Sequence, residues 1–258
     1  MTTSLIITTY NWPEALALVL KSVLTQTRFP NEIIIADDGS RGDTAKLIKS
    51  VSESTEISII HVWQKDDGFR AASIRNKAIR KATGEYLILI DGDMILHSCF
   101  MENHIDYAKE NSFVQGSRVL IKEEKTKEVL KTKMCNFTFF NMGLGNRKNA
   151  IYSNFLANIF SKNNNTLKGI KTCNFALYRK DAFKVNGFDE EFVGWGREDS
   201  EFAVRLLNFG IERNDIKFHA IAYHLYHNEN TRQSLLENDD RLHNSIEKKL
   251  KWCEKGLV

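Results

Sequence analysis

The sequence predicts an α/β protein with a mostly parallel central sheet and helices on both of its faces. The first half of the chain alternates between apolar runs and helical segments, an order that produces parallel strands joined by right-handed crossovers. The apolar runs are continuous and do not alternate in polarity, so each strand is expected to be covered on both faces. A chain of 258 residues, 42% of them hydrophobic, has room for such a core.

The expected elements follow one another from the N-terminus. The first is a strand at residues 4–9, followed by a helix from about Pro13 to Gln26 with Asn11 as its N-cap and Pro13 in its first turn. Further strands are expected at residues 32–37, 57–62 and 86–91, and further helices at residues 43–51 and 69–82. Sheets of this kind bind ligands beyond the carboxyl ends of their strands, so polar residues there are functional candidates.

The second half of the chain is less regular. Residues 119–171 are rich in Asn, Phe and Lys without a clean period, and we interpret them as an inserted, partly mobile region. Order returns with a helix from about Arg197 to Phe209. Its apolar face consists of Phe202, Ala203, Leu206 and Leu207.

The C-terminal tail, residues 231–258, carries apolar residues at helical spacing among several lysines. The apolar stripe consists of Leu242, Ile246, Leu250, Cys253 and Leu257. One interpretation is a helix that docks on its own domain. The other is a basic amphipathic helix that lies on a membrane or on a partner.

Charge and cysteine content argue against several classes of protein. The net charge of +3 is small and evenly spread, which argues against nucleic acid as a partner. The four cysteines are far apart without a CxxC pair, as in a reducing compartment, and they indicate neither a zinc site nor a disulfide framework. The N-terminus lacks the basic region of a signal peptide, and no apolar stretch is long enough to cross a bilayer. We therefore expect a cytoplasmic protein, either soluble or peripherally bound to the membrane.

Two carboxylates flank one glycine in the segment Asp91-Gly92-Asp93, directly after an apolar strand. Asp-Gly is a strong hairpin signal, but a hairpin needs a second strand at once, and the following residues become helix-like. The alternative is that a hard divalent cation holds the two carboxylates together and leaves positions open for phosphate oxygens.

A second pair of acids, Asp37 and Asp38, ends another strand. These residues either form the turn before Gly39 or accept hydrogen bonds from a base or a ribose hydroxyl, with Tyr10 stacking on the base. Arg75 lies within the apolar stripe of the helix at residues 69–82. Either its stem packs while its head reaches solvent or a buried acid, or its guanidinium points into the cleft towards a diphosphate.

The segment "FVGWGREDSEF" places Trp195 between two glycines, so the backbone can bend sharply there. Glu198 and Asp199 follow in the first turn of a helix, where the dipole favours the ionised carboxylate. A structural helix start explains the acids but not the Gly-Trp-Gly sequence. An ionised carboxylate beside an aromatic loop suits a general base acting on a sugar hydroxyl.

Five segments resemble the family 2 glycosyltransferases of the GT-A fold in order and spacing. Four are N-terminal: "IITTYNWPEALALVLKSVLTQT", "EIIIADDGS", "GFRAASIRNKAI" and "YLILIDGDM". The fifth, "NGFDEEFVGWGREDSEF", resembles the C-terminal segment shared by β1,4-galactosyltransferases and bacterial chondroitin-type polymerases. The resemblance covers nearly the whole chain apart from residues 120–168 and the tail. One departure is Arg197, where relatives often have a glycine.

The resemblance implies an architecture and a role for each residue. The fold is expected to be Rossmann-like with a smaller acceptor-side region, forming one domain over residues 1–230 with a nucleotide-sugar-binding half at 1–118 and an acceptor and catalytic half at 119–230. Asp199 is implied as the catalytic base with Glu198 beside it, and Asp93 as a ligand for Mn²⁺ or Mg²⁺. His224, with His227 as the alternative, and Asp91 are further candidate ligands. The residues implied for the donor are Thr8, Tyr10, Asn11, Asp37, Asp38, Arg75, Asp91, Gly92, Trp195 and Gly196.

The activity implied by the resemblance is a metal-dependent, inverting transfer of a hexose or N-acetylhexosamine from a UDP-sugar to a saccharide or lipid-linked saccharide. Bacterial surface polysaccharide, such as capsule or lipopolysaccharide, is the expected product. Two other hypotheses remain at this point. A sugar-phosphate nucleotidyltransferase would use similar acids but needs a glycine-rich phosphate loop, which "TTYNWPEA" does not provide. A non-catalytic carbohydrate-binding protein of the same fold would bind sugar without turnover.

Overall fold

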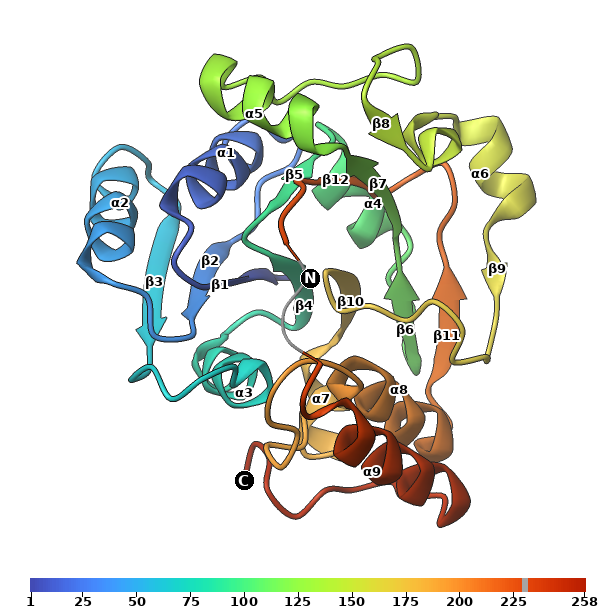
Figure 1. Cartoon of the computed structure of the whole chain (residues 1–258). Helices are drawn as coiled ribbons and strands as arrows, with labels where there is room; N and C mark the ends of the chain where they lie inside the picture. The colour runs from blue at the N-terminus through green and yellow to red at the C-terminus, as the bar shows by residue number, and fades with distance from the viewer. Residues whose placement is uncertain (229–231) are drawn as a thin grey trace.

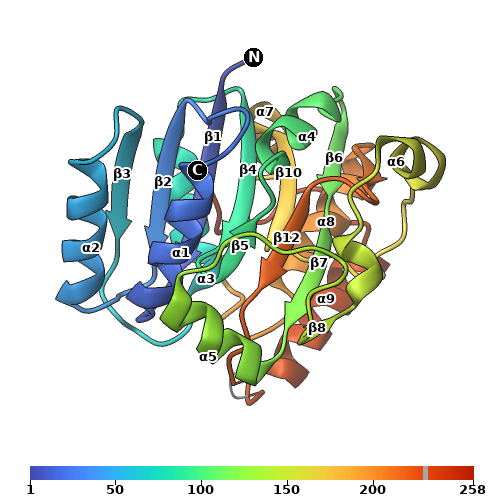
Figure 2. The same ribbon diagram turned by 90° about the horizontal axis from the view of Figure 1, so that it is seen from above.

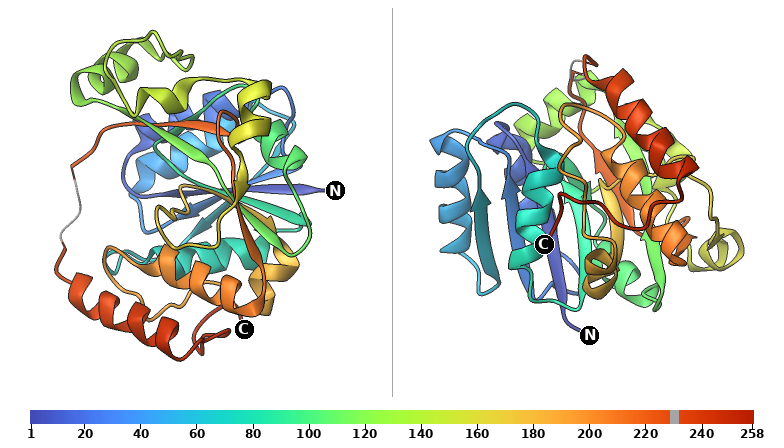
Figure 3. Two further views of the ribbon diagram at one scale, coloured as in Figure 1. Left: turned by 90° about the vertical axis from the view of Figure 1, so that its right-hand side faces the viewer. Right: turned by 90° about the horizontal axis from the view of Figure 1, so that it is seen from below.

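The computed structural model describes residues 1–228 and 232–258, which form three layers with a twisted sheet in the middle (Figures 1 and 3). Within these residues the main sheet has eight strands in the order β3-β2-β1-β4-β10-β6-β11-β9. β10 and β9 run antiparallel to their neighbours and the remaining pairs are parallel, so the prediction of a mostly parallel sheet is confirmed. The strands are β1 (Thr3–Thr9), β2 (Glu32–Asp37), β3 (Ser58–Trp63), β4 (Tyr86–Asp91), β6 (Ser112–Gln115), β9 (Lys162–Asn163), β10 (Asn174–Tyr178) and β11 (Glu212–Asp215).

Helices cover both faces of this sheet, as the continuous apolar strands predict (Figure 2). One face packs against α1 (Pro13–Val23), α2 (Gly42–Ser52) and α4 (Phe100–Asp106). The other face packs against α3 (Ala71–Lys81), α7 (Arg179–Lys184) and α8 (Glu198–Phe209). Alternate residues of each strand enter the two cores, so that Leu5 and Ile7 belong to the first and Ile6 to the second.

A second, four-stranded sheet lies beside the first in the described part of the chain, in the order β5-β12-β7-β8. β5 pairs with β12 and not with β4, so the rejection of a hairpin at Gly92 is confirmed. The strands are β5 (Met94–Leu96), β12 (Ile221–His224), β7 (Ser117–Ile121) and β8 (Leu144–Gly145).

Residues 119–171 contain more regular structure than the sequence predicted. They include α5 (Glu123–Thr132), a 3₁₀ helix at Arg147–Ala150 and α6 (Asn154–Phe160). The interpretation as an irregular insertion is wrong for α5. This helix buries only Thr126 and Val129 among charged residues, so its apolar period was too weak to recognise.

Asn11 does not cap the first helix, contrary to the prediction. Trp12 occupies the N-cap position of α1, and the helix ends at Val23 and not at Gln26. Asn11 instead has a left-handed backbone with φ 48°, and its Oδ1 accepts a hydrogen bond of 3.0 Å from the backbone N–H of Arg41. The side chain that would have capped α1 therefore joins the loop after β1 to the loop after β2.

The C-terminal stripe is not a continuous helix. α9 (Leu235–Glu247) packs on α8 and ends before Leu250. Leu257 is buried in the core beside α3, where its backbone N–H donates to Asn186 O at 3.0 Å. Leu242, Cys253 and Leu257 are buried against the protein itself whereas Ile246 is exposed, so the first interpretation holds for most of the stripe and a contact with a membrane stays a prediction. The expected boundary at residues 230–231 lies outside the described residues, and no described helix is long and apolar enough to cross a bilayer.

Candidate functional site

The acidic residues gather at the carboxyl edge of the main sheet because β1, β2 and β4 are parallel and end together. Asp91 pairs in register with Thr8, and the N–H of Gly92 donates to Thr8 O at 2.7 Å. A Cβ atom at Gly92 would lie 2.8 Å from Thr9 Oγ1, too close for any other residue. Glycine therefore lets the end of β4 lie directly against β1, which fixes the start of the loop that carries Asp93.

Arg75 lies at the centre of the acidic cluster and contacts three carboxylates. Its Nη1 donates to Glu198 Oε1 and to Asp199 Oδ1, both at 3.2 Å, and its Nη2 donates to Asp91 Oδ1 at 3.4 Å. The Arg75 side chain is only 6% exposed. The guanidinium is therefore paired with acids that are partly or largely buried, which is one of the two interpretations of Arg75 that the sequence allowed.

Burial and the shared guanidinium act in opposite directions on the pKa values of the carboxylates in the cluster. Burial acts to lower the pKa of Arg75, but the carboxylates of Asp199, Asp91 and Glu198 more than offset it and raise the pKa. Burial, followed by repulsion from Asp199, raises the pKa of Glu198 to about 7. Burial likewise raises the pKa of Asp91, although Arg75 opposes the shift. One cation thus serves three acids, and burial holds the pKa of one of them, Glu198, near neutrality.

Glu198→Gln is expected to stabilise the metal-free protein at alkaline pH. The pKa of Glu198 rises from 4.5 to about 7 on folding, so the folded state holds a proton that the unfolded state lacks between these values. The stability of the wild type therefore falls as pH rises from about 4.5 to about 7 and stays reduced above, by up to about 3 kcal/mol. Urea unfolding in EDTA should show the variant to be more stable than the wild type at pH 8 and equal to it at pH 4. A difference that does not depend on pH would contradict the assignment.

Asp199 is held in a fixed orientation in the first turn of α8. Its Oδ2 accepts the backbone N–H of Thr172 at 3.0 Å, and its Oδ1 accepts the Thr172 hydroxyl at 2.5 Å. The carboxylate remains 23% exposed. Thr172 could not be recognised from the sequence because it follows a stretch without a clear hydrophobic period and lies 27 residues from its partner. Its contacts leave Asp199 ordered and still accessible.

The Gly-Trp-Gly loop has the backbone that its glycines permit. Gly194 and Gly196 have φ values of 76° and 108°, in the left-handed region that favours glycine. Arg197 has φ 76° although it carries a side chain, and its guanidinium pairs with Asp239 of α9. The Gly196 carbonyl accepts a hydrogen bond of 2.9 Å from Asn238 Nδ2, also on α9. The C-terminal helix therefore holds the loop that presents Trp195.

Asp93, His224 and His227 form a cluster with the composition of a metal site. Their candidate ligand atoms all lie within 4.8 Å of one another. Asp93 Oδ2 is 3.3 Å from Nε2 of both histidines, while its Oδ1 is buried without a hydrogen-bond partner among the described residues. A carboxylate and two imidazoles suit a divalent cation such as Mn²⁺, and a cation would compensate the buried oxygen. Both histidines come together, whereas the sequence prediction treated them as alternatives.

Asp37 and Asp38 are committed to hydrogen bonds within the protein. Asp37 is fully buried, with Oδ1 accepting the Ser40 N–H at 2.8 Å and Oδ2 2.8 Å from His61 Nε2. Asp38 Oδ1 accepts from Gln64 Nε2 at 2.5 Å, and its Oδ2 accepts the Arg70 N–H at 2.8 Å. These contacts favour the turn-forming interpretation, and a direct contact with the donor stays a prediction.

Tyr10, which is predicted to stack on the base, is exposed to solvent. Its ring is 51% exposed, and its hydroxyl donates to Asp66 Oδ2 at 3.0 Å. An exposed ring at the carboxyl edge of β1 leaves a face free for stacking on a base.

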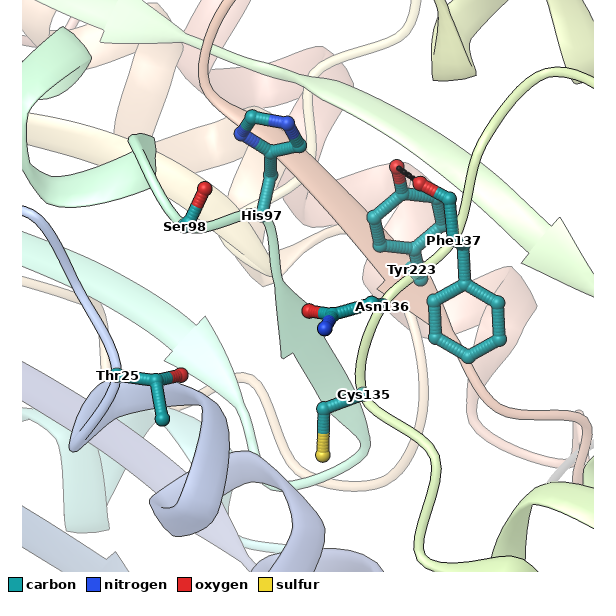
Figure 4. A pocket seen from close by; sticks show the side chains of 7 residues that line it. All are labelled: Thr25, His97, Ser98, Cys135, Asn136, Phe137 and Tyr223. Atoms are coloured by element: carbon teal, nitrogen blue, oxygen red, sulfur yellow. Dashed lines mark hydrogen bonds between the residues drawn. The ribbon is translucent and has the colours of Figure 1, made fainter.

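A cavity of about 410 Å³ lies away from the acids (Figure 4). It is lined by His97, Cys135, Phe137 and Tyr223, among others, and the Tyr223 hydroxyl donates to Phe137 O at 3.0 Å. Tyr223 precedes His224 in β12, so the two side chains point to opposite faces of the small sheet. This cavity is therefore separate from the cluster of Asp93 and the histidines.

Comparison with known proteins identifies relatives that match the fold and most of the chain. The family model described as glycosyl transferase family 2 matches residues 4–187, and that described as N-terminal domain of galactosyltransferase matches residues 156–228. The chain is similar to a hyaluronan synthase of Pasteurella multocida, with 27% identity over 80% of this chain and 23% of the relative. It is also similar to a chondroitin synthase of Escherichia coli, with 27% identity over 86% of this chain and 34% of the relative. The chain thus spans only about a quarter to a third of the length of these two relatives.

A solved structure of GalNAc-T7 with UDP, GalNAc and Mn²⁺ has the same fold as this chain. The TM-score is 0.69 with 15% sequence identity, and the match covers 95% of this chain and 48% of the other. The prediction of a GT-A fold is thereby confirmed. The first family model covers well over half of the 258 residues. The chain therefore belongs to glycosyl transferase family 2.

Proposed function

We propose that the protein is a metal-dependent, inverting glycosyltransferase. It transfers a hexose or N-acetylhexosamine from a UDP-sugar to a saccharide hydroxyl, in the synthesis of a bacterial surface polysaccharide such as capsule or lipopolysaccharide from cytoplasmic sugar nucleotides. The observation that carries the proposal is the Arg75 guanidinium, which joins Asp91, two residues before the metal cluster, to Asp199. A candidate base and a candidate metal site thereby lie at one edge of the sheet.

The residues of the cluster support a division of roles. Asp93, His224 and His227 would hold the metal, which when bound supplies positive charge beside a diphosphate. Asp199 would accept the proton of the acceptor hydroxyl. Its Oδ2 receives one hydrogen bond from Thr172 among the described residues and keeps a lone pair for this proton. Arg75 and Thr172 would keep the carboxylate oriented.

The remaining predicted residues would contact the donor. Tyr10 would stack on the base, and Trp195 would cover the sugar and exclude water from the reacting centre. Glu198 would contact the sugar beside Asp199. An inverting reaction places the acceptor opposite the departing diphosphate, so the base and the metal belong on different sides of the sugar.

The test is a screen of UDP-sugars for slow hydrolysis, because water can replace an unknown acceptor. The wild type should release UDP from at least one UDP-sugar with Mn²⁺ or Mg²⁺ present, and EDTA should abolish the release. If no UDP-sugar is hydrolysed while a sugar phosphate and a nucleoside triphosphate yield pyrophosphate, the protein is a nucleotidyltransferase instead. Nucleotide binding without turnover of any donor or acceptor would indicate a binding protein.

A further inference from the structure

A basic cavity of about 320 Å³ opens beside the chain segment of Thr172, the residue that holds the candidate base, on the side of the sheet away from the nucleoside residues. It is lined by residues from the ends of β6 and β11, the starts of β7 and β10, the loop before β10 and the turn at residues 146–149. β6 and β11 run in the same direction as β4, so their carboxyl ends lie at the same edge as Asp91. In the strand order, Thr8 and Asp37 lie on one side of β4 and this cavity lies on the other.

A short stretch of chain, residues 171–173, connects the lining of the cavity to Asp199. Lys171 and Cys173 both line it, and Thr172 between them donates two hydrogen bonds to the Asp199 carboxylate. Burial raises the pKa of the Cys173 thiol to about 12, and the charges of Asp91 and Arg118 act on that thiol in opposite directions. Cys173 thus lies between the acidic cluster and the basic cavity.

Only one of the five cationic side chains that line the cavity, Arg213, has an acidic partner among the described residues. Arg213 and Asp215 neutralise each other, with Arg213 Nε donating to Asp215 Oδ1 at 2.7 Å. The other four cationic side chains form no ion pair within 4.0 Å with any residue that the structure describes. They are Arg118, Lys168, Lys171 and Lys217. Their charges repel one another, and an anionic ligand would relieve this repulsion.

We propose that this cavity is the subsite for an acceptor saccharide that carries an anionic group, either the carboxylate of a uronic acid or a phosphate ester. The inference rests on the proposed function and deepens it, since it names the chemical class of the acceptor. An acceptor anchored here places a hydroxyl near Asp199 Oδ2.

The test compares three small probes in EDTA, so that no metal ion binds the anions. The probes are methyl β-D-glucuronide, glucose 6-phosphate and the neutral methyl β-D-glucoside, titrated against the full chain by ligand-observed NMR. At least one anionic probe should bind the wild type about tenfold more tightly than the neutral one. The anionic probe with the higher affinity identifies the anionic group of the acceptor as a carboxylate or a phosphate ester. Raising NaCl from about 0.05 to 0.5 M should remove this preference because salt screens exposed charges.

Matched variants locate the preference in the cavity. The double variant Arg118→Gln/Lys217→Gln should bind the anionic probe about tenfold more weakly and the neutral probe unchanged. Lys46→Gln, which removes an exposed lysine of α2, should keep the wild-type preference. Equal binding of all three probes, a preference insensitive to salt, or an unchanged preference in the double variant would overturn the proposal. Hydrolysis of UDP-sugars by the wild type tests the proposed function separately, so the two failures are distinguishable.

Discussion

Asp199→Asn is expected to abolish sugar transfer while UDP-sugar binding remains. Asparagine has the size of aspartate but cannot accept a proton from an acceptor hydroxyl at neutral pH, and loss of a general base lowers a rate by about 10²–10⁴-fold. The Asn side-chain carbonyl can still accept one of the hydrogen bonds from Thr172, so α8 should keep its position. The rate of transfer to an acceptor found by screening and the affinity for UDP with Mn²⁺, measured by calorimetry, separate these two effects.

Asp240→Asn is the control for this experiment, because Asp240 is exposed on α9, away from the acidic cluster. It should transfer sugar at the wild-type rate. Normal turnover by Asp199→Asn would remove Asp199 from the role of base. The nearest remaining carboxylate would then be Glu198, which contacts the same guanidinium.

Asp93→Ala is expected to eliminate the effect of metal on nucleotide affinity. The carboxylate is the only acidic member of the cluster with His224 and His227, so its removal leaves two neutral ligands among the described residues. Replacing residues that merely support a metal ligand weakens metal binding by 10–100-fold, so losing the ligand itself should cost about 100-fold or more. Calorimetric titration of Mn²⁺ into protein, with and without UDP, measures this loss without any turnover.

Single histidine variants decide whether both imidazoles bind the metal. His224→Ala and His227→Ala should each weaken Mn²⁺ binding, since both Nε2 atoms lie 3.3 Å from Asp93 Oδ2. His243→Ala, at an exposed position of α9, is the matched control and should bind Mn²⁺ like the wild type. Unchanged Mn²⁺ affinity in Asp93→Ala would discard the cluster as the metal site.

The parallel half of the fold was predictable from the sequence because its signals are local. Each of the strands β1, β2 and β4 is a continuous apolar run, and each ends at polar residues that proved to lie at one edge. The small sheet was not predictable. β5 has only three residues, and its partner β12 lies more than a hundred residues away, so neither strand has a local signal strong enough to suggest the pairing.

The candidate site was predictable as a set of residues but not as a set of contacts. Asp93 and Asp199 were recognised by motif and resemblance. The pairing of Arg75 with Asp199 spans 124 positions, and neither local sequence contains a pattern that indicates it. In the C-terminal tail the sequence suggested a structure that does not form, a single helical stripe from Leu242 to Leu257. Cys253 and Leu257 have helical spacing to Leu242, yet they are buried in a segment without regular secondary structure, because apolar spacing reports burial and not the backbone that achieves it.

The Arg75 ion pairs have a consequence for how the protein is made. During synthesis the arginine leaves the ribosome well before its partners Glu198 and Asp199, which follow 123 and 124 positions later. Of the three carboxylates that Arg75 contacts in the folded protein, only Asp91 has been synthesised by then. The acidic cluster is therefore completed late in translation, and a truncated product ending before α8 would lack two of the three carboxylates that pair with Arg75.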